Sequence, residues 1–449
     1  MRALLVSTYD LGRQPFGLAS PAAWLRRAGI DVSCVDTSRE ALDDERIAAA
    51  GVIAFYLPMH TATRLAAPVI ERVRRVNPSA RLCAYGLYAP LNADWLHERG
   101  VTDILGPEAE QDLVDLVTAR SPTPGAQGLP RLPFIQPDRA GLVPLDRYAS
   151  LRMPDGTRRV IGSTDATRGC KHVCRHCPIV PVYKGHFRVV PVDVVMADVR
   201  GLVGAGAQHV TFGDPDFLNA PTHARRLVER FSRECPGVSY DATIKIEHLL
   251  QHAEMVPLLR DTGCLFVTSA VESIDDRVLE KLRKGHTRKD FLSALALCRG
   301  AGLTLSPTFI PFTPWTSLAG YVELLDLLLD QELVEQVAPI QLAIRLLVTA
   351  ESPLLDLPEI GGRVAPFDHA SLTWPWRHES DEVDALHASV MRTVREMTDE
   401  PRGAVFSAIA TLARRAAGMS APVVLAEAGT RAPCVSEPWY CCAEPMDSL

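Results

Sequence analysis

Three cysteines stand close together in the stretch Thr167–Pro178, spaced C-x3-C-x2-C: Cys170, Cys174 and Cys177. Thiolates are soft ligands that hold iron–sulfur clusters and zinc. Three thiolates within one short loop can bind three irons of a four-iron cluster and leave the fourth iron open to another ligand. A structural zinc site usually takes two separated ligand pairs, although His172 or His176 could complete one here. The spacing therefore predicts an iron–sulfur cluster on these cysteines, with zinc as the alternative.

Polar residues also follow apolar runs further along the chain. Asp214 lies in Phe212-Gly-Asp-Pro-Asp-Phe217, and Glu272 follows the run that ends at Val271. Lys245 and Glu247 alternate in Ala242–Glu247, which places them on one face of a strand. Charges on a strand buried on both faces are costly unless they are paired. We therefore expect either a bound ligand or a plain Lys–Glu pair at Lys245, and either a ligand site or a simple turn at Gly213 and Asp214.

The elements that must position these residues alternate between strand and helix. The first half predicts strands at 2–7, 31–36, 51–58, 80–86 and 103–105. Such alternation predicts a doubly wound parallel sheet, which binds ligands at the carboxyl ends of its strands. Here those ends carry Ser7-Thr8-Tyr9, Pro58-Met59-His60 and Gly86-Leu87-Tyr88.

A Pro- and Gly-rich stretch then predicts a linker, and the alternation resumes after it. We expect domains at 1–120 and 158–350, a linker at 121–157 and a helical extension at 351–449. The second domain predicts strands at 160–162, 209–213, 239–246, 264–271, 304–311 and 339–347, with helices between them that include 248–260 and 276–298. Further helices are expected at 380–398 and 404–417. Six β/α units predict an incomplete parallel barrel, whose chemistry lies at the carboxyl ends of its strands.

These motifs together resemble the radical SAM superfamily, and more closely its subgroup with an N-terminal cobalamin-binding-type, Rossmann-like domain; the resemblance covers most of residues 1–350. It implies a partial (β/α)6 barrel in which Cys170, Cys174 and Cys177 hold a [4Fe-4S] cluster. It also implies that S-adenosylmethionine (SAM) chelates the open iron and is cleaved by one electron from the cluster. Residues implied in binding SAM are His176, Gly213, Asp214, Lys245, Glu272 and, on a later strand, Arg345.

The resemblance leaves cobalamin open. Many corrinoid domains ligate cobalt through an Asp-x-His-x-x-Gly loop, whereas this chain has Asp10-Leu-Gly-Arg-Gln-Pro-Phe-Gly17. Some family members bind cobalamin without that histidine. The alternatives are a bound cobalamin and a relic sheet that only shapes the pocket.

The tail Cys441-Cys442-Ala-Glu-Pro445 resembles the ending of CUAEP/CCAEP-tail radical SAM proteins, some of which carry selenocysteine there. Interchange of sulfur and selenium favours chemistry with soft nucleophiles or metalloids. We expect Cys434, Cys441 and Cys442 to assist catalysis, for example by holding trivalent arsenic or by quenching a radical. The alternative is a tail with incidental thiols.

Composition narrows the functional classes. The chain has 449 residues, 47% hydrophobic and 22% charged, with a net charge of -7 and 11 cysteines. This indicates a soluble protein without a basic nucleic-acid-binding arm, and no apolar run is long enough to span a membrane. We expect a cytoplasmic location, where cysteines serve as ligands or core residues rather than disulfides.

The expected function is a radical SAM enzyme that transfers a SAM-derived alkyl group to a small molecule, with a flavodoxin- or ferredoxin-type electron donor. Alternatives are 3-amino-3-carboxypropyl transfer to thiol-held arsenite, and a non-catalytic iron–sulfur or thiol sensor.

Overall fold

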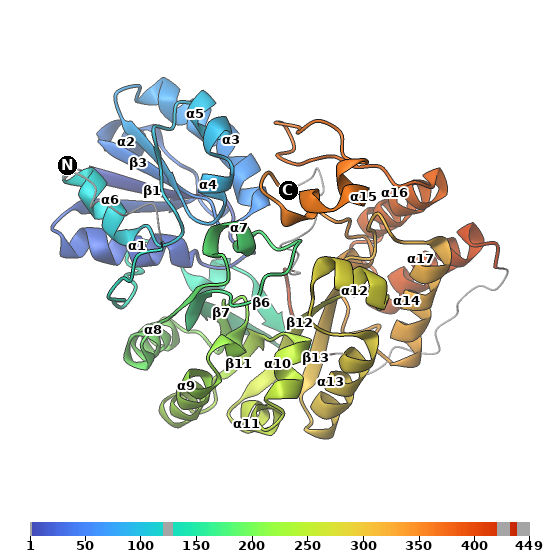
Figure 1. Ribbon diagram of the computed structural model, residues 1–449. Coiled ribbons are helices and arrows are strands. Elements are labelled where there is room, and N and C mark those ends of the chain that lie inside the picture. The colour runs from blue at the N-terminus through green and yellow to red at the C-terminus, as the bar shows by residue number, and fades with distance from the viewer. Residues whose placement is uncertain (1, 120–128, 420–431, 438–449) are drawn as a thin grey trace.

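A computed structural model describes residues 2–119, 129–419 and 432–437 of the chain. Two sheets dominate it: an N-terminal sheet, and a curled sheet that we call the barrel sheet (Figure 1). The short helix α7 (Ile179–Tyr183) lies between them in the ribbon view.

The N-terminal sheet is parallel, in the order β2-β1-β3-β4-β5. Its strands are β1 (Arg2–Ser7), β2 (Asp31–Asp36), β3 (Val52–Tyr56), β4 (Arg81–Tyr85) and β5 (Asp103–Ile104). Its helices are α1 (Phe16–Arg27), α2 (Asp44–Ala49), α3 (His60–Val76), α4 (Tyr88–Leu91), α5 (Ala93–Glu98) and α6 (Glu110–Val117). Because side chains alternate along a strand, Leu4 and Val6 pack against α2 and α3, whereas Ala3 and Leu5 pack against α1 and α6. The predicted doubly wound domain is therefore confirmed.

The barrel sheet has the order β13-β12-β11-β10-β7-β6-β14. The run from β7 to β13 is parallel, whereas β6 pairs antiparallel with β7 and β14 antiparallel with β6. Its strands are β6 (Ser150–Arg152), β7 (Arg158–Thr164), β10 (His209–Phe212), β11 (Ser239–Thr243), β12 (Cys264–Glu272), β13 (Thr304–Phe309) and β14 (Cys434–Val435). A separate hairpin joins β8 (Thr167–Gly169) to β9 (Phe187–Val189).

Helices cover the outer face of this sheet. They are α8 (Val192–Gly204), α9 (Pro221–Glu234), α10 (Ile246–Gln251), α11 (Met255–Asp261), α12 (Asp276–Leu282), α13 (Arg288–Gly300) and α14 (Leu318–Asp330). Val210 and Phe212 belong to the hydrophobic core cluster that these helices share, except for α12, whose Val278 and Leu282 belong to a separate cluster. The alternate residues of β10 and β11 are polar instead: His209 Nε2 and Thr211 Oγ1 lie 2.8 and 2.6 Å from Asp241 Oδ1. Mutual hydrogen bonding makes this buried polar layer tolerable.

Four predicted elements differ from the structure, and the first three are two strands and a helix. The predicted strand 239–246 ends at Thr243, and the chain turns at Ile244 and Lys245 into α10. The predicted sixth strand, 339–347, is a 3₁₀ turn at Pro339–Leu342 followed by an isolated bridge between Phe312 and Arg345. The predicted helix 248–260 is divided into α10 and α11.

The predicted helix 276–298 is also divided, into α12 and α13. Arg283 and Gly285 adopt left-handed backbone conformations, at φ 53° and 76°, which stop α12. A capping box of Thr287 and Asp290 then starts α13. The interruption brings Lys284 into the protein interior, where only 3% of its surface is exposed.

The C-terminal region is integrated with both domains. Its helices are α15 (Pro358–Gly361), α16 (Asp381–Glu396) and α17 (Arg402–Ala416), and the last two pack into the barrel's core cluster. The Ser371 carbonyl oxygen lies 2.6 Å from His60 Nε2, and the Trp95 indole nitrogen donates to the His369 carbonyl oxygen. The segment between α15 and α16 thus packs on the N-terminal domain. The predicted domain limits stay predictions, although β6 lies inside the predicted linker and pairs with β7.

None of the helices that the structure describes is long and apolar enough to cross a membrane.

Two glycines allow a matched test of the turn after β4. Gly86 and Gly206 both have φ near +100°, at 108° and 101°, but a Cβ on Gly86 would lie 2.8 Å from the Leu57 carbonyl oxygen, whereas a Cβ on Gly206 would meet nothing within 4 Å. We expect Gly206→Ala to cost about 1–3 kcal/mol from backbone strain alone, and Gly86→Ala to cost more. Urea unfolding of both variants measures the difference. Equal losses would show that Leu57 moves aside freely.

Candidate cofactor site

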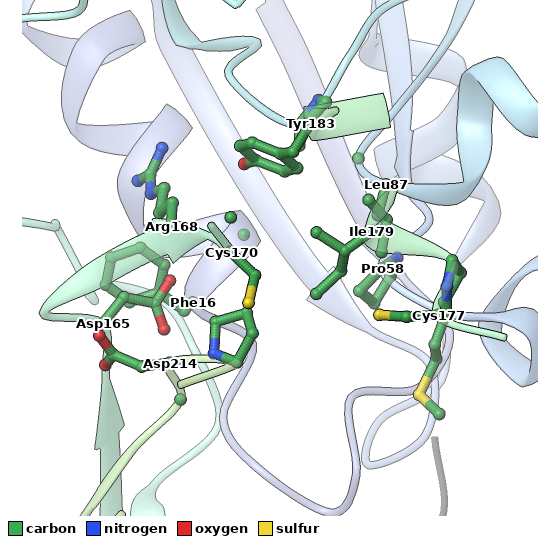
Figure 2. Close-up of a pocket in the computed structure, with 18 of the residues that line it drawn as sticks. Phe16, Pro58, Leu87, Asp165, Arg168, Cys170, Cys177, Ile179, Tyr183 and Asp214 are labelled. Atoms are coloured by element: carbon green, nitrogen blue, oxygen red, sulfur yellow. The ribbon is translucent and has the colours of Figure 1, made fainter. Parts of the chain in front are cut away.

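The cysteine loop lies between β8 and α7. Cys170 and Cys174 are buried, Cys177 is half-buried, and all three line one cavity. Burial raises the pKa of the Cys170 thiol to about 11, which a bound cation would oppose. Gly169 is required before the loop: its φ is +76°, and a Cβ there would lie 2.3 Å from the Tyr183 ring. Figure 2 shows Cys170 and Cys177 with Asp165, Asp214 and Arg168 around the cavity.

Arg168 fastens this loop to the N-terminal domain. Its Nη1 donates to Glu110 Oε1 at 2.7 Å and to Glu108 Oε2 at 3.1 Å, and its Nη2 donates to Ser20 Oγ at 3.1 Å. Tyr183, at the end of α7, donates to the second oxygen of Glu108. Burial alone would lower the pKa of Arg168, but Glu110 and Glu108 raise it above its usual range. This ion pair was missed from sequence, because nothing local links Arg168 to residues about sixty positions earlier.

Asp214 and Gly213 lie where β10 ends, as predicted, and both line the cavity. Asp214 accepts from the Ala166 amide at 2.9 Å and from the Thr167 hydroxyl at 2.5 Å. Burial, with Asp165 nearby, raises the pKa of Asp214 to about 7. A Cβ on Gly213 would lie 2.6 Å from Asp165 Oδ1, so a larger residue here would displace the Asp165 carboxylate. The motif therefore shapes the cavity wall and also holds the strand that precedes the cysteine loop.

Glu272 is the centre of a second buried group. It ends β12 at φ +69°, a left-handed conformation that costs a non-glycine residue about 1–3 kcal/mol. Its Oε1 lies 3.0 Å from His176 Nε2 and 3.3 Å from Lys284 Nζ. Burial would raise the pKa of Glu272, but Lys284 and His176 lower it to about 2. Lys284 was missed from sequence because the predicted helix ran through it.

The imidazole of His176 leaves one nitrogen in the cavity wall for a bound ligand such as a nucleoside. Its ring lines the cavity, and burial lowers its pKa despite the Glu272 contact. Its Nδ1 is buried and has no hydrogen-bond partner among the described residues. A buried polar atom without a partner is costly unless a ligand satisfies it. The three thiols on this cavity suit an iron–sulfur cluster, and the His176 nitrogen beside them suits an adjacent nucleoside.

Lys245 also lines the cavity, and its Nζ lies 3.3 Å from Glu247 Oε2. The Lys–Glu pair expected from sequence is therefore present, and the role of Lys245 toward a carboxylate ligand stays a proposal. Arg345 is not brought to the cavity. Its guanidinium donates to Asp384 and to the Trp376 carbonyl, and it stacks on the Trp376 ring at 3.7 Å.

Of the predicted catalytic thiols, Cys434 is described. It pairs with Arg152 at the edge of the barrel sheet and is not part of the cavity lining. Cys441 and Cys442 lie outside the described residues. Glu437 is the last described residue, and it accepts from the Tyr9 hydroxyl at 2.5 Å and from Arg39 at 3.3 Å.

The cavity, of about 340 Å³, lies between the two sheets. From the N-terminal domain it is lined by residues that follow β1, β3 and β4, among them Asp10, Arg13, Pro58, Met59, Gly86 and Tyr88. In a sheet of order 2-1-3-4-5, the point between β1 and β3 is where the strand order reverses, and ligands bind there. The cavity therefore joins the ligand-binding edge of one sheet to the cysteine loop of the other.

Residues 165–328 match the family model of the "Radical SAM superfamily". This chain carries a radical SAM domain. That domain implies a [4Fe-4S] cluster and SAM as cofactors.

Curated relatives match parts of the chain. A hopanoid C-3 methylase of Methylococcus capsulatus is 28% identical over 160 residues, covering 36% of this chain and 30% of the relative. A tRNA-2-methylthio-N(6)-dimethylallyladenosine synthase of Bordetella pertussis is 25% identical over 264 residues, covering 54% of each protein. The chain thus spans about a third to a half of these relatives.

Two solved structures share the fold. TsrM of Kitasatospora setae, a radical SAM methyltransferase solved with cobalamin and a [4Fe-4S] cluster, aligns with a TM-score of 0.57 at 17% identity and covers 74% of this chain and 71% of that one. OxsB, a cobalamin-dependent radical SAM enzyme solved with aqua-cobalamin and SAM, aligns with a TM-score of 0.67 at 12% identity and covers 92% and 71%. The arrangement of an N-terminal sheet beside a barrel sheet is thus shared with these two folds.

The Lys284–Glu272 pair allows a charge-removal test. Lys284→Met leaves the Glu272 carboxylate buried without its main counter-charge, which we expect to cost about 3–5 kcal/mol at neutral pH. The pKa of Glu272 then rises above its unfolded value, so the loss shrinks as the pH falls through that raised pKa. Urea unfolding of the cluster-free protein at several pH values measures it.

The double variant Lys284→Met/Glu272→Gln, which leaves neither charge, should recover part of the loss. Lys281→Met removes a half-exposed partner of Glu359 and should change stability little. Equal losses in the single and double Lys284 variants would contradict the assignment.

The Arg168 ion pair yields a separate expectation. Arg168→Met leaves Glu108 and Glu110 uncompensated at the domain interface and should cost about 3–5 kcal/mol. Because Arg168 lies two residues before Cys170, we also expect fewer iron atoms per chain after reconstitution. Adding Glu108→Gln and Glu110→Gln to Arg168→Met should restore much of the lost stability, because no charge is then left buried without a partner. Full iron loading in the Arg168→Met variant would contradict a role of Arg168 in positioning the cysteine loop.

Proposed function

We propose that this chain is a radical SAM enzyme that cleaves SAM reductively and transfers an alkyl group to a small molecule. The observation that carries the proposal is the convergence on one cavity of three cysteines with Asp214, Lys245, His176 and Glu272. These residues come from three successive strand ends and the loop that precedes them. A non-catalytic sensor would need the thiols alone, whereas this cavity also holds the charged groups that a zwitterionic ligand requires.

Each side chain has a role that its chemistry suits. Cys170, Cys174 and Cys177 hold the cluster, which supplies the electron that cleaves a carbon–sulfur bond of SAM. Asp214 and the end of β10 accept from the SAM ammonium, and Lys245 faces its carboxylate. Glu272 accepts from the ribose hydroxyls while Lys284 keeps it ionised. His176 Nδ1 faces the adenine, where its unused hydrogen-bonding capacity would be satisfied.

We further propose that the half of the cavity beneath the N-terminal sheet holds cobalamin, which supplies the methyl carrier when bound. Support comes from the strand-order reversal between β1 and β3, from the wall formed by Tyr56, Tyr85 and Tyr88, and from the two cobalamin-binding neighbours of the same fold. The described lining residues of the N-terminal domain include no histidine, and Arg13 lies there instead. His60, which follows Met59, is engaged with the Ser371 carbonyl. Cobalamin would therefore bind without a histidine from this domain on its cobalt.

A second candidate is transfer of another SAM-derived fragment, such as 3-amino-3-carboxypropyl, to an acceptor held by tail thiols, of which trivalent arsenic is one. The position of Glu437 favours it, because this residue contacts Tyr9, directly before the cavity-lining Asp10. Cys441 and Cys442 follow Glu437 by four and five positions, and an extended chain spans at most about 3.6 Å per residue. Chain length alone therefore limits Cys441 to about 14 Å and Cys442 to about 18 Å from Glu437.

Product analysis tests these proposals. The protein is reconstituted anaerobically with iron, sulfide and hydroxocobalamin, freed of unbound corrinoid, and incubated with SAM and a flavodoxin or chemical reductant, with or without arsenite. Methyl transfer through cobalamin predicts a corrinoid absorbance and S-adenosylhomocysteine, whereas aminocarboxypropyl transfer predicts methylthioadenosine. Absence of every SAM-derived product from a fully loaded cluster would refute both.

The matched variants compare cysteines inside and outside the cavity. Cys174→Ala should abolish cluster absorbance and all SAM cleavage, because the cluster loses one of its three protein ligands. Cys235→Ala, at the end of α9, should retain both, because this cysteine does not line the cavity. Retained cleavage in Cys174→Ala would place the cluster elsewhere.

A further inference from the structure

A second group of potential metal ligands lies beside the cysteine loop and is not used by the chemistry proposed above. It consists of His172, between two of the cysteines, Asp216, after β10, and His248, in α10. One ligand atom from each lies within 4.8 Å of the others. The side chains of Asp216 and His248 are fully buried, and 14% of the His172 side chain is exposed.

The spacing of the donor atoms suits a small cation. His172 Nε2 lies 3.2 Å from His248 Nε2 and 3.4 Å from Asp216 Oδ2. Two donors bound to one zinc ion at about 2.0–2.1 Å and a tetrahedral angle lie about 3.3–3.4 Å apart. The three side chains therefore lie close enough for one cation to bind them once the side chains rotate toward it.

Two buried atoms of this group contact each other without a well-aligned hydrogen bond. Asp216 Oδ1 accepts from the Leu218 amide, which anchors the carboxylate and leaves Oδ2 directed at the imidazoles. Oδ2 lies 2.7 Å from His248 Nδ1, yet neither atom has a hydrogen-bond partner of acceptable geometry among the described residues. Buried polar atoms that meet in this way are explained by strain or by a bound water or ion that would separate them.

We propose that His172, Asp216 and His248 bind a first-row divalent cation. Two imidazoles and one carboxylate form the donor set that Zn²⁺ and Fe²⁺ accept, in each case with a coordination position left for an exogenous ligand. Glu247 Oε2, 3.6 Å from His172 Nδ1, places a carboxylate on the outer side of that imidazole, as metal-bound histidines commonly have. His172 also lines the cavity, which gives the cation a route of entry and an outlet for its open position.

A cation at this site would join three segments that the sequence separates. His172 belongs to the cysteine loop, Asp216 to the turn after β10, and His248 to the helix after β11. The site would thus hold the middle of the cysteine loop independently of the cluster. It does not depend on the proposed alkyl transfer, because cation binding is measured without SAM or an acceptor.

The test measures Zn²⁺ and Co²⁺ binding to the full-length, cluster-reconstituted protein under anaerobic conditions. Because tail thiols also bind such ions, the background carries Cys434→Ser, Cys441→Ser and Cys442→Ser. We expect one Zn²⁺ or Co²⁺ per chain, or one iron beyond the cluster iron. The Co²⁺ spectrum should show ligand-field bands without a thiolate charge-transfer band.

Asp216→Asn and His248→Gln should each weaken this binding by more than about 100-fold, because replacing even the partner of a metal ligand costs about 10–100-fold. Cluster absorbance and circular dichroism verify that both variants are folded. His252→Gln is the matched control: its ring lies 5.8 Å from His248 on the next turn of the chain, and it is outside the ligand group. Unchanged affinity in both ligand variants, or no bound cation in the tail-substituted parent, would overturn the proposal and indicate a hydrogen-bonded histidine pair.

Discussion

The buried ion pair of Arg168 with Glu108 and Glu110 is the interaction on which the architecture of this protein depends. It crosses the interface between the N-terminal domain and the barrel two residues before Cys170. Two buried carboxylates without Arg168 would be strongly unfavourable, and a buried guanidinium without them equally so. The two domains are therefore held together where the cavity forms. This charge arrangement, together with the Tyr183 bond to Glu108, fixes the N-terminal domain against the cysteine loop.

The same principle governs the interior of the cavity. Glu272 stays ionised because Lys284 and His176 outweigh its burial. Burial instead outweighs the effect of Arg168 and Arg13 on Asp165, whose pKa rises to about 6, and it raises the pKa of Asp214 to about 7. One wall thus carries a fixed negative charge and the other carries carboxyls close to their titration at neutral pH. A ligand with an ammonium group would draw the second set into the ionised form. This asymmetry suits a zwitterionic cofactor that must be held in one orientation.

Local patterns were informative where one element decided the outcome. The cysteine spacing, the strand alternation of residues 2–104, and the positions of Asp214 and Glu272 at strand ends follow from short-range chemistry and periodicity. The sequence predictions were wrong at turns that the pattern of apolar residues does not mark. Lys245 follows a strand rather than lying on it, and Lys284 interrupts an expected helix because Arg283 and Gly285 take left-handed conformations. Arg345, placed near the cavity by its position in the chain, instead pairs with Asp384.

By itself, the sequence determined that three thiols share one loop, that this loop precedes a β/α barrel pattern, and that a second α/β unit comes before it. Only the tertiary structure decided which distant residues meet there. Arg168 finds its partners about sixty residues away, Lys284 finds Glu272 across a strand end, and His172 finds Asp216 and His248. The physical reason is that spacing along a chain encodes local geometry, whereas the pairing of buried charges is selected by the free energy of removing them from water together.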